Sequence, residues 1–365
     1  MPDAEATFIT SPAAQAGPVP ARVLAALSAA ADAEERGAAP IAASVDLLRR
    51  AGLLEDDGTA DPARTARALM QVGGVNLSVG RLWEGHVNAL HLIRLRGTSA
   101  QRDRVRKWLA QGALFGVWGA DGVPPVTLSP GGAQLVGVKN FASGLGTLSH
   151  ALVTVGSGPD VRLALIEVRA GDRADLSGWT VPGMRATASG SFDMTGIEPG
   201  PDGWIGGPGD YLREPSFVGG VWRIAALQAG ASAGLVDRAA ASLRETGRLA
   251  AEAQKTRLMT ALMRVWAGMA LTERAAVAAS DPAIAAEDAV SLSISARLFT
   301  EEAALAAIHA VEQSLGLRHF AQGSPTGRMA RDLSVYLRQA ARDALLQQAA
   351  DHVLGRDGGI GGLPA

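Results

Sequence analysis

The spacing of apolar positions divides the chain into three regions. Through the first third, apolar residues recur every three to five positions, as in "NLSVGRLWEGHVNALHLIRLRG" (76–97), which is typical of amphipathic helices. The middle region has short Val- and Leu-rich runs separated by Gly and Pro, which predicts strands. Helical spacing then returns. We therefore expect an α+β protein with an N-terminal helical domain (1–112), a central β-domain (113–210) and a C-terminal bundle of long helices (211–365).

Local signals mark the ends of several helices. Asp61, followed by a proline, can cap a helix that a Gly-Gly pair ends, and Thr98 or Ser99 can cap the next short helix. In the C-terminal region, Asp281 is the expected cap and Gly316 the expected stop of a long helix. The segment 326–355 has no interruption of this kind, so we expect one last long helix there.

The middle region contains five segments that we expect to be strands. They follow one another without helices between them, so the sheet should be antiparallel, as a barrel or sandwich. "GSGPD" (156–160) between two of them predicts a hairpin loop. The five segments are "ALFGVWG" (113–119), "GAQLVGV" (132–138), "HALVTV" (150–155), "VRLALIEV" (161–168) and "SGSFDM" (189–194).

Composition limits the classes of partner. A net charge of −2 favours neither nucleic acid nor an anionic membrane surface, and the absence of cysteine excludes disulfides and thiolate chemistry. The longest apolar stretch (217–236) carries Arg223 and Gln228, so we interpret it as a buried helix, not a membrane span. The acidic N-terminus is unlike a signal peptide, and we expect a cytoplasmic protein.

Aromatic residues make up only 4% of the chain. The core must therefore be built mainly from Ala, Leu and Val, which lets helices approach closely. Large apolar faces on Ala-rich helices also predict a homodimer or homotetramer.

Neither metal nor dinucleotide motifs are evident. His86 and His91 are five residues apart on one expected helix, about 140° apart around its axis, so they cannot share a metal as an i, i+4 pair could. "GGPGDY" (206–211) does not lie between a strand and a helix, which argues against a Rossmann site. We expect no metal site.

Four segments in order resemble the acyl-CoA dehydrogenase family of flavoproteins, from about Ala21 to Leu354. The segment 80–119 is similar to that family's helix, "G…Q+" turn and first strand, and "VKNFASGLGTLSHALVTV" (138–155) to its "G-x-K-x-W-[IV]-[TS]" strand. "GWTVPGMRATASGSFDMTGI" (178–197) resembles "G-M-R-x-[ST]…L-x-F-x-x-V". "HAVEQSLG…GRMARDLSVYLRQA" resembles "A-x-Q-x-[FL]-G…R-x-x-R-D". The resemblance implies a helical, β, helical fold.

The resemblance also implies FAD as cofactor. In the family the strand at 138–155 meets the flavin, which places Phe141 on the isoalloxazine ring, Ser143 beside it, and Gly144 where the backbone approaches closely. The alternative is a core aromatic followed by a bulge. The complete set of cofactor-binding candidates is Phe141, Ser143, Gly144, Trp118, and, where a neighbouring subunit would meet FAD, Gln313 and Gly316.

Departures from the family pattern concern catalysis. Its substrate loop is replaced by "GADGVPPVTLS" (119–129), its pyrophosphate-binding Arg segment is reduced to "LRETGRLAAEAQ" (243–254), and its two positions for the catalytic Glu are Ala340 and Trp222 here. Removal of an α-proton needs a positioned base. The candidates are His86 and Glu84. The alternatives are a helix histidine bonded to a carbonyl and a solvated glutamate.

The leading hypothesis is an FAD-dependent oxidoreductase acting on the CH–CH bond of an acyl thioester or a related small molecule. A flavin-dependent monooxygenase or oxidase is the alternative that the missing Glu and His86 favour. A flavin-free binding or scaffold protein is the third. We interpret Arg185 as an ion-pairing or capping residue and Arg331-Asp332 as a pair on the helix surface or a dimer contact.

Overall fold

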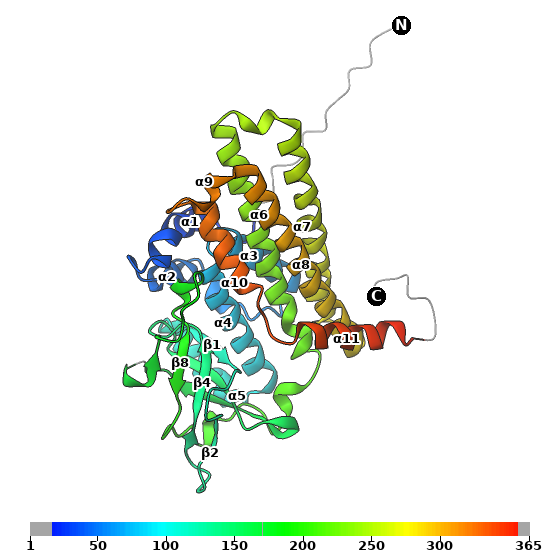
Figure 1. Cartoon of the computed structure of the whole chain (residues 1–365). Helices are drawn as coiled ribbons and strands as arrows, with labels where there is room; N and C mark the ends of the chain where they lie inside the picture. The colour runs from blue at the N-terminus through cyan, green and yellow to red at the C-terminus, as the bar shows by residue number, and fades with distance from the viewer. Residues whose placement is uncertain (1–16, 170, 357–365) are drawn as a thin grey trace, which may run out of the picture.

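The computed structural model describes residues 17–169 and 171–356, and it has helices, then strands, then helices along the chain. In Figure 1 the long helices α6, α7 and α8 run side by side, and the strands gather at one end of α4. The helices are α1 Ala21–Glu35, α2 Ala42–Arg50, α3 Pro62–Val75, α4 Leu77–Arg96, α5 Ser99–Ala110, α6 Trp222–Glu245, α7 Glu252–Ala278, α8 Ala286–Leu315, α9 Leu317–Phe320, α10 Pro325–Tyr336 and α11 Arg342–Leu354. The strands are β1 Phe115–Trp118, β2 Thr127–Leu128, β3 Leu135–Val136, β4 Val138–Ala142, β5 His150–Val155, β6 Arg162–Glu167, β7 Ala174–Asp175 and β8 Gly190–Asp193.

The early helix caps are confirmed, and one later cap is wrong. The side chain of Asp61 accepts a hydrogen bond from the backbone of Arg64, and Thr98 forms a capping box with Gln101. Asp281, by contrast, accepts from the backbone of Ala283 and closes the turn between α7 and α8. The helix α8 begins later, at Ala286, without a side-chain cap.

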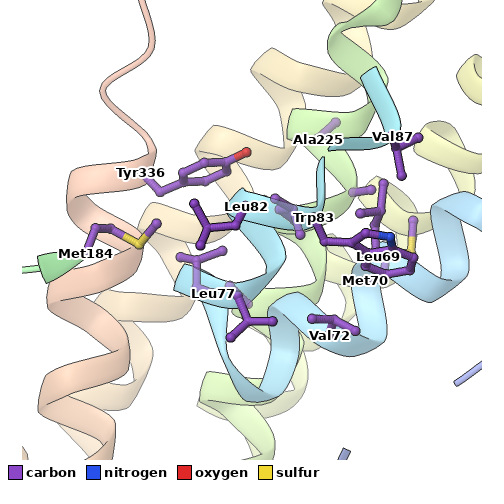
Figure 2. Packing of buried hydrophobic residues seen from close by; sticks show 14 of the residues in the cluster. Leu69, Met70, Val72, Leu77, Leu82, Trp83, Val87, Met184, Ala225 and Tyr336 are labelled. Carbon is purple, nitrogen blue, oxygen red and sulfur yellow. The ribbon is translucent and has the colours of Figure 1, made fainter. Parts of the chain in front are cut away.

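The bundle is held together by close helix contacts at small residues, as the aromatic-poor composition predicted. A Cβ atom added to Gly230 of α6 would lie 2.0 Å from the carbonyl oxygen of Met70 on α3, and one on Gly234 would lie 1.9 Å from that of Gly74. The two helices can therefore approach only because both positions lack side chains. Figure 2 shows larger side chains of the same core, among them Trp83 of α4, close to Leu69 and Met70 of α3.

The strands form three small sheets and not the fully antiparallel barrel or sandwich expected. β5 and β6 form the predicted hairpin around residues 156–161, and β4, β8 and β7 pair antiparallel. β1, however, pairs parallel with β5. The antiparallel prediction is wrong there because the chain passes through β2, β3 and β4 before it returns in the same direction. No sheet within the described residues closes on itself.

The expected last long helix is two helices, so that prediction is wrong. The chain turns between α10 and α11, where Ala341 has a left-handed φ of +61°. No Gly or Pro marks this break. Arg342 lies near Glu301 and Glu302 of α8, at 3.4 and 3.5 Å, and these tertiary contacts direct α11 away from the axis of α10 (Figure 1).

The apolar stretch 217–236 lies mostly in the buried helix α6, as expected. No described helix is both long and apolar enough to cross a membrane.

Candidate active site

A cavity of about 840 Å³ lies between β4, the segment after β7, the end of α8 and α10. This volume is within the range of roughly 300–1,000 Å³ that is common for small-molecule and cofactor sites. The lining combines exposed aromatic rings with charged side chains at the α10 wall. The wall includes Arg81, Phe141, Ser143, Trp179, Met184, Thr187, Ser189, Glu312, His319, Phe320, Arg331, Tyr336, Arg338, Gln339 and Ala340.

Backbone strain is concentrated around this cavity. Outside glycine, left-handed φ values in the described residues occur at Phe141 (+53°), Met184 (+56°), Ala188 (+44°) and Ala341 (+61°). The first two line the cavity, and the other two are sequence neighbours of residues that line it. Such conformations cost about 1–3 kcal/mol each and are typical of ligand sites. A second hollow of about 840 Å³, between α1, α3, α6, α7 and α10, has none of these residues in its wall.

Phe141 and Ser143 lie in the cavity wall on and just after β4. Phe141 is 67% exposed, which excludes the core position considered as its alternative. The hydroxyl of Ser189 donates to that of Ser143 at 2.9 Å, and Thr187 lies 2.8 Å from Ser189. Because Ser143 accepts from Ser189, its own proton remains for a ligand in the cavity.

Gly144 and Trp118 support this wall from behind and do not line the cavity. A Cβ on Gly144, which has φ +86°, would lie 2.6 Å from Cγ of Leu148, so its close contact is with the protein interior. Trp118 is buried and its Nε1 donates to the carbonyl of Ser143 at 3.1 Å. A direct flavin contact for these two residues stays a prediction.

Glu35 of α1 holds the segment 184–187 that forms another part of the wall. Its carboxylate accepts from the backbone N–H groups of Arg185 and Ala186, at 3.0 and 3.1 Å. Burial raises the pKa of Glu35, and the nearby Asp332 raises it further. The contribution of Arg185 is thus made by its backbone, and its side chain is exposed.

Asp332 of α10 holds the same segment from the other side. It accepts from the backbone of Met184 at 2.9 Å and from Arg328 at 2.8 Å, and burial raises its pKa. A Cβ at Gly183 would lie 2.7 Å from the carbonyl oxygen of Arg331, so glycine permits this contact. Asp332 is 1% exposed, and the interpretation of Arg331-Asp332 as a surface pair is wrong for Asp332.

His86 lies in the interior, and it is not part of the cavity wall. Its Nε2–H donates to the carbonyl of Leu54 at 2.7 Å, and Nδ1 accepts from the backbone of Phe115 at 3.0 Å. Burial lowers its pKa to about 4. With both nitrogens bonded, His86 joins α4 to β1. This is the alternative considered from the sequence, a helix histidine bonded to a backbone carbonyl. Its geometry offers no support for the catalytic role.

Glu84 is buried rather than solvated. It pairs with Arg81 at 2.8 Å and lies 3.7 Å from Nε of Arg223. Nη2 of Arg223 donates to Oδ1 of Asn88 at 2.7 Å. Arg81 links this cluster to the cavity. Tyr336 also lies in the cavity wall, and its hydroxyl has no hydrogen-bond partner among the described residues. Burial and Glu84 raise the pKa of Tyr336, so the hydroxyl stays protonated. Glu84 itself does not line the cavity.

Gln313 and Gly316, the residues expected at a subunit contact, are exposed at the end of α8. The amide of Gln313 lies 2.9 Å from Nε2 of His309, and Gly316 caps the helix with φ +58°. Their neighbour Glu312 lines the cavity, and they do not.

The two positions at which the family resemblance expects a catalytic Glu, Ala340 and Trp222, lie in different parts of the structure. Ala340 lines the cavity together with Arg338 and Gln339, so this is the one of the two positions that adjoins the cavity. Trp222 is buried elsewhere, beside a small separate pocket. Glu312 is the one carboxylate in the cavity wall as far as the chain is described. The resemblance singled out Ala340 in this break, whereas Arg338 and Gln339 carried no signal in the sequence.

Comparisons with known proteins show the fold. TdsC, a dibenzothiophene monooxygenase from Paenibacillus sp. A11-2 solved with FMN, is 18% identical with a TM-score of 0.79, over 94% of this chain and 97% of that one. KijD3, solved with FMN and a dTDP-sugar, is 20% identical with a TM-score of 0.77, over 95% of each chain. 3-HSA hydroxylase from Rhodococcus sp. RHA1 is 18% identical with a TM-score of 0.74, over 93% of this chain and 96% of that one.

No family model and no curated protein sequence matches the chain. The described chain has the acyl-CoA dehydrogenase-like fold that the resemblance implied, with small sheets in place of a barrel.

Proposed function

We propose that this protein is a flavin-dependent oxidoreductase of the monooxygenase or oxidase type. The observation that carries the proposal is the cavity wall itself. It presents an exposed aromatic ring, Phe141, and a hydroxyl with a proton to donate, Ser143, while the break at 338–340 holds no carboxylate. The structurally similar TdsC and KijD3 bind FMN, so FMN joins FAD as a candidate cofactor.

The residues present fit a flavin. Phe141 would cover the flat ring, Ser143 would donate to a polar atom at its edge, and the apolar lining would exclude water. Glu35 and Asp332 would keep the wall in place through the segment 184–187. A bound flavin would supply the electron chemistry: it accepts a hydride equivalent, and in its reduced form it reacts with oxygen.

An acyl-thioester dehydrogenase is the alternative, and the missing base argues against it. Loss of a general base costs typically 10²–10⁴-fold in rate. Neither His86, with both nitrogens bonded, nor Glu84, paired with Arg81, is placed to replace it. Glu312 is the remaining carboxylate that an acyl substrate could meet.

The first test is the visible absorption spectrum after the protein is mixed with FMN or FAD and desalted. Retained flavin supports the proposal, and folded protein without flavin favours the flavin-free scaffold. The flavin-loaded protein is then mixed anaerobically with butyryl-CoA. Bleaching of the flavin would favour the dehydrogenase. Separately, photoreduced flavin, oxygen and indole are combined with the protein, and we expect an oxygenated product.

We also propose that the protein forms a homodimer or homotetramer. Met259, Met263 and Trp266 lie at i, i+4 and i+7 on α7 and are 41%, 53% and 52% exposed, an apolar stripe for which a second copy is the simplest cover. Light scattering that gives the monomer mass would contradict this.

A further inference from the structure

The charged side chains of the cavity wall are mainly cationic. Three arginines, Arg81, Arg331 and Arg338, face one carboxylate, Glu312. Burial lowers the pKa of His319, so this ring is neutral at pH 7 and adds no charge. The cavity therefore carries an excess of positive charge.

Two of the three arginines have no acidic partner. Arg81 is neutralised by Glu84 at 2.8 Å. No ion pair joins Arg331 or Arg338 to a carboxylate anywhere in residues 17–169 and 171–356, and the neighbouring Asp332 already bonds Arg328. Both arginines are exposed residues that line the cavity, Arg331 on α10 and Arg338 just after its end.

The same cavity offers flat apolar surface. Phe320 is 63% exposed, and Trp179 is half-buried in the wall. Aromatic rings of this kind stack on flat ligands, and a planar guanidinium matches the two oxygens of a carboxylate. Arg338 also stands in the break at 338–340, beside the position where a dehydrogenase would need its base.

We propose that the cavity binds a flat aromatic substrate that carries a carboxylate, and that Arg331 and Arg338 bind this group. The inference deepens the proposed function, on which it rests, by giving the substrate class for the same cavity. Arg338, in the break at 338–340, would bind the carboxylate of the substrate. It would not act as a base that removes a proton.

Isothermal titration calorimetry with 2-naphthoate and 2-naphthamide tests the proposal, because the two probes share one shape and differ in charge. We expect the wild type, with and without FMN, to bind the acid about tenfold more tightly. The double variant Arg331→Gln/Arg338→Gln should reduce this ratio to about one. Arg264→Gln, an exposed arginine on α7 outside the cavity, should leave the ratio unchanged.

Three results would overturn the proposal. One is equal affinity for the two probes, or no binding of either, in the wild type. Another is a double variant that lowers the melting temperature and keeps the ratio, which would limit Arg338 to stabilising the end of α10. The third is a double variant that weakens FMN but not riboflavin and keeps the ratio, which would assign the arginines to the flavin phosphate. Because the ratio is measured without flavin as well, a protein that binds no flavin would refute the proposed function and leave this inference standing.

Discussion

Two regions of the molecule differ in their backbone: the contact between the helices α3 and α6, and the wall of the cavity. At the helix contact, small residues let two backbones meet, and the backbone stays regular. At the cavity, Phe141, Met184 and Ala188 hold left-handed conformations, and a helix breaks without Gly or Pro. In the first region the glycines keep ordinary helical angles although glycine is a weak helix former, and in the second, residues other than glycine hold angles that they rarely adopt. Such rare angles are a property of sites whose strain is offset by the surrounding structure.

The largest effect should come from breaking the helix contact. In Gly230→Ala the new Cβ would lie 2.0 Å from the backbone oxygen of Met70, so α3 must move. We expect a loss of at least about 3 kcal/mol in the free energy of unfolding, measured with urea. Gly85→Ala on α4 is the control, because its Cβ would meet no backbone of another element and would come within 4 Å only of Nη1 of Arg81, at 3.2 Å. It should gain up to about 1 kcal/mol. Equal effects of the two variants would contradict close packing as the cause.

His86 should show that its role is structural. Its pKa is about 4 in the folded protein, below the unfolded value of 6.5, so the unfolded state binds more protons between these values. Stability is then complete above pH 6.5 and is lost as the pH falls toward 4, by up to about 3 kcal/mol. His86→Gln can keep both hydrogen bonds without titrating, so its stability should fall less over this window.

Urea unfolding at a series of pH values measures this difference. His309→Gln, at an exposed position on α8, is the matched control and should keep the wild-type pH profile. A His86→Gln profile parallel to that of the wild type would show that His86 is not held neutral by burial.

The sequence predicted the scaffold better than the site. The caps at Asp61 and Thr98 were identifiable because each satisfies free backbone donors locally. The break after Tyr336 was not, because it depends on contacts of Arg342 with α8. The resemblance alone singled out Phe141 and Ser143, which line the cavity.

Other residues at or behind the site were missed for a related reason. Arg331 and Arg338 look like ordinary surface cations in the sequence, and only the fold brings them to a cavity with Ser143. Glu35 is distant in sequence from the segment 184–187 that it holds, and no periodicity links the two.

Two substitutions at Phe141 distinguish the effect of its backbone strain from the effect of its ring on ligand binding. Phe141→Gly removes the strain of φ +53° but adds backbone freedom to the unfolded chain, so we expect stability to change by no more than about 1 kcal/mol. FMN affinity should fall about tenfold because the ring is lost. Phe141→Leu retains a side chain at the same φ and should lose FMN affinity to a similar extent. Fluorescence titration of FMN measures the affinity, and unchanged affinity in both variants would remove Phe141 from the site.

The smallest effect is expected at Ser143, where one hydrogen bond is at stake. Ser143→Ala removes the acceptor of Ser189, whose hydroxyl can turn to Thr187 at 2.8 Å, so the free energy of unfolding should fall by about 1 kcal/mol or less. Loss of its donated proton should weaken FMN about two- to tenfold in the same titration. Ser149→Ala is the control, since that hydroxyl bonds the backbone of Leu114 outside the cavity. It should cost similar stability and leave FMN affinity unchanged. If both variants weakened FMN equally, the effect would come from the stability of the sheet, and the spare proton of Ser143 would not be a ligand contact.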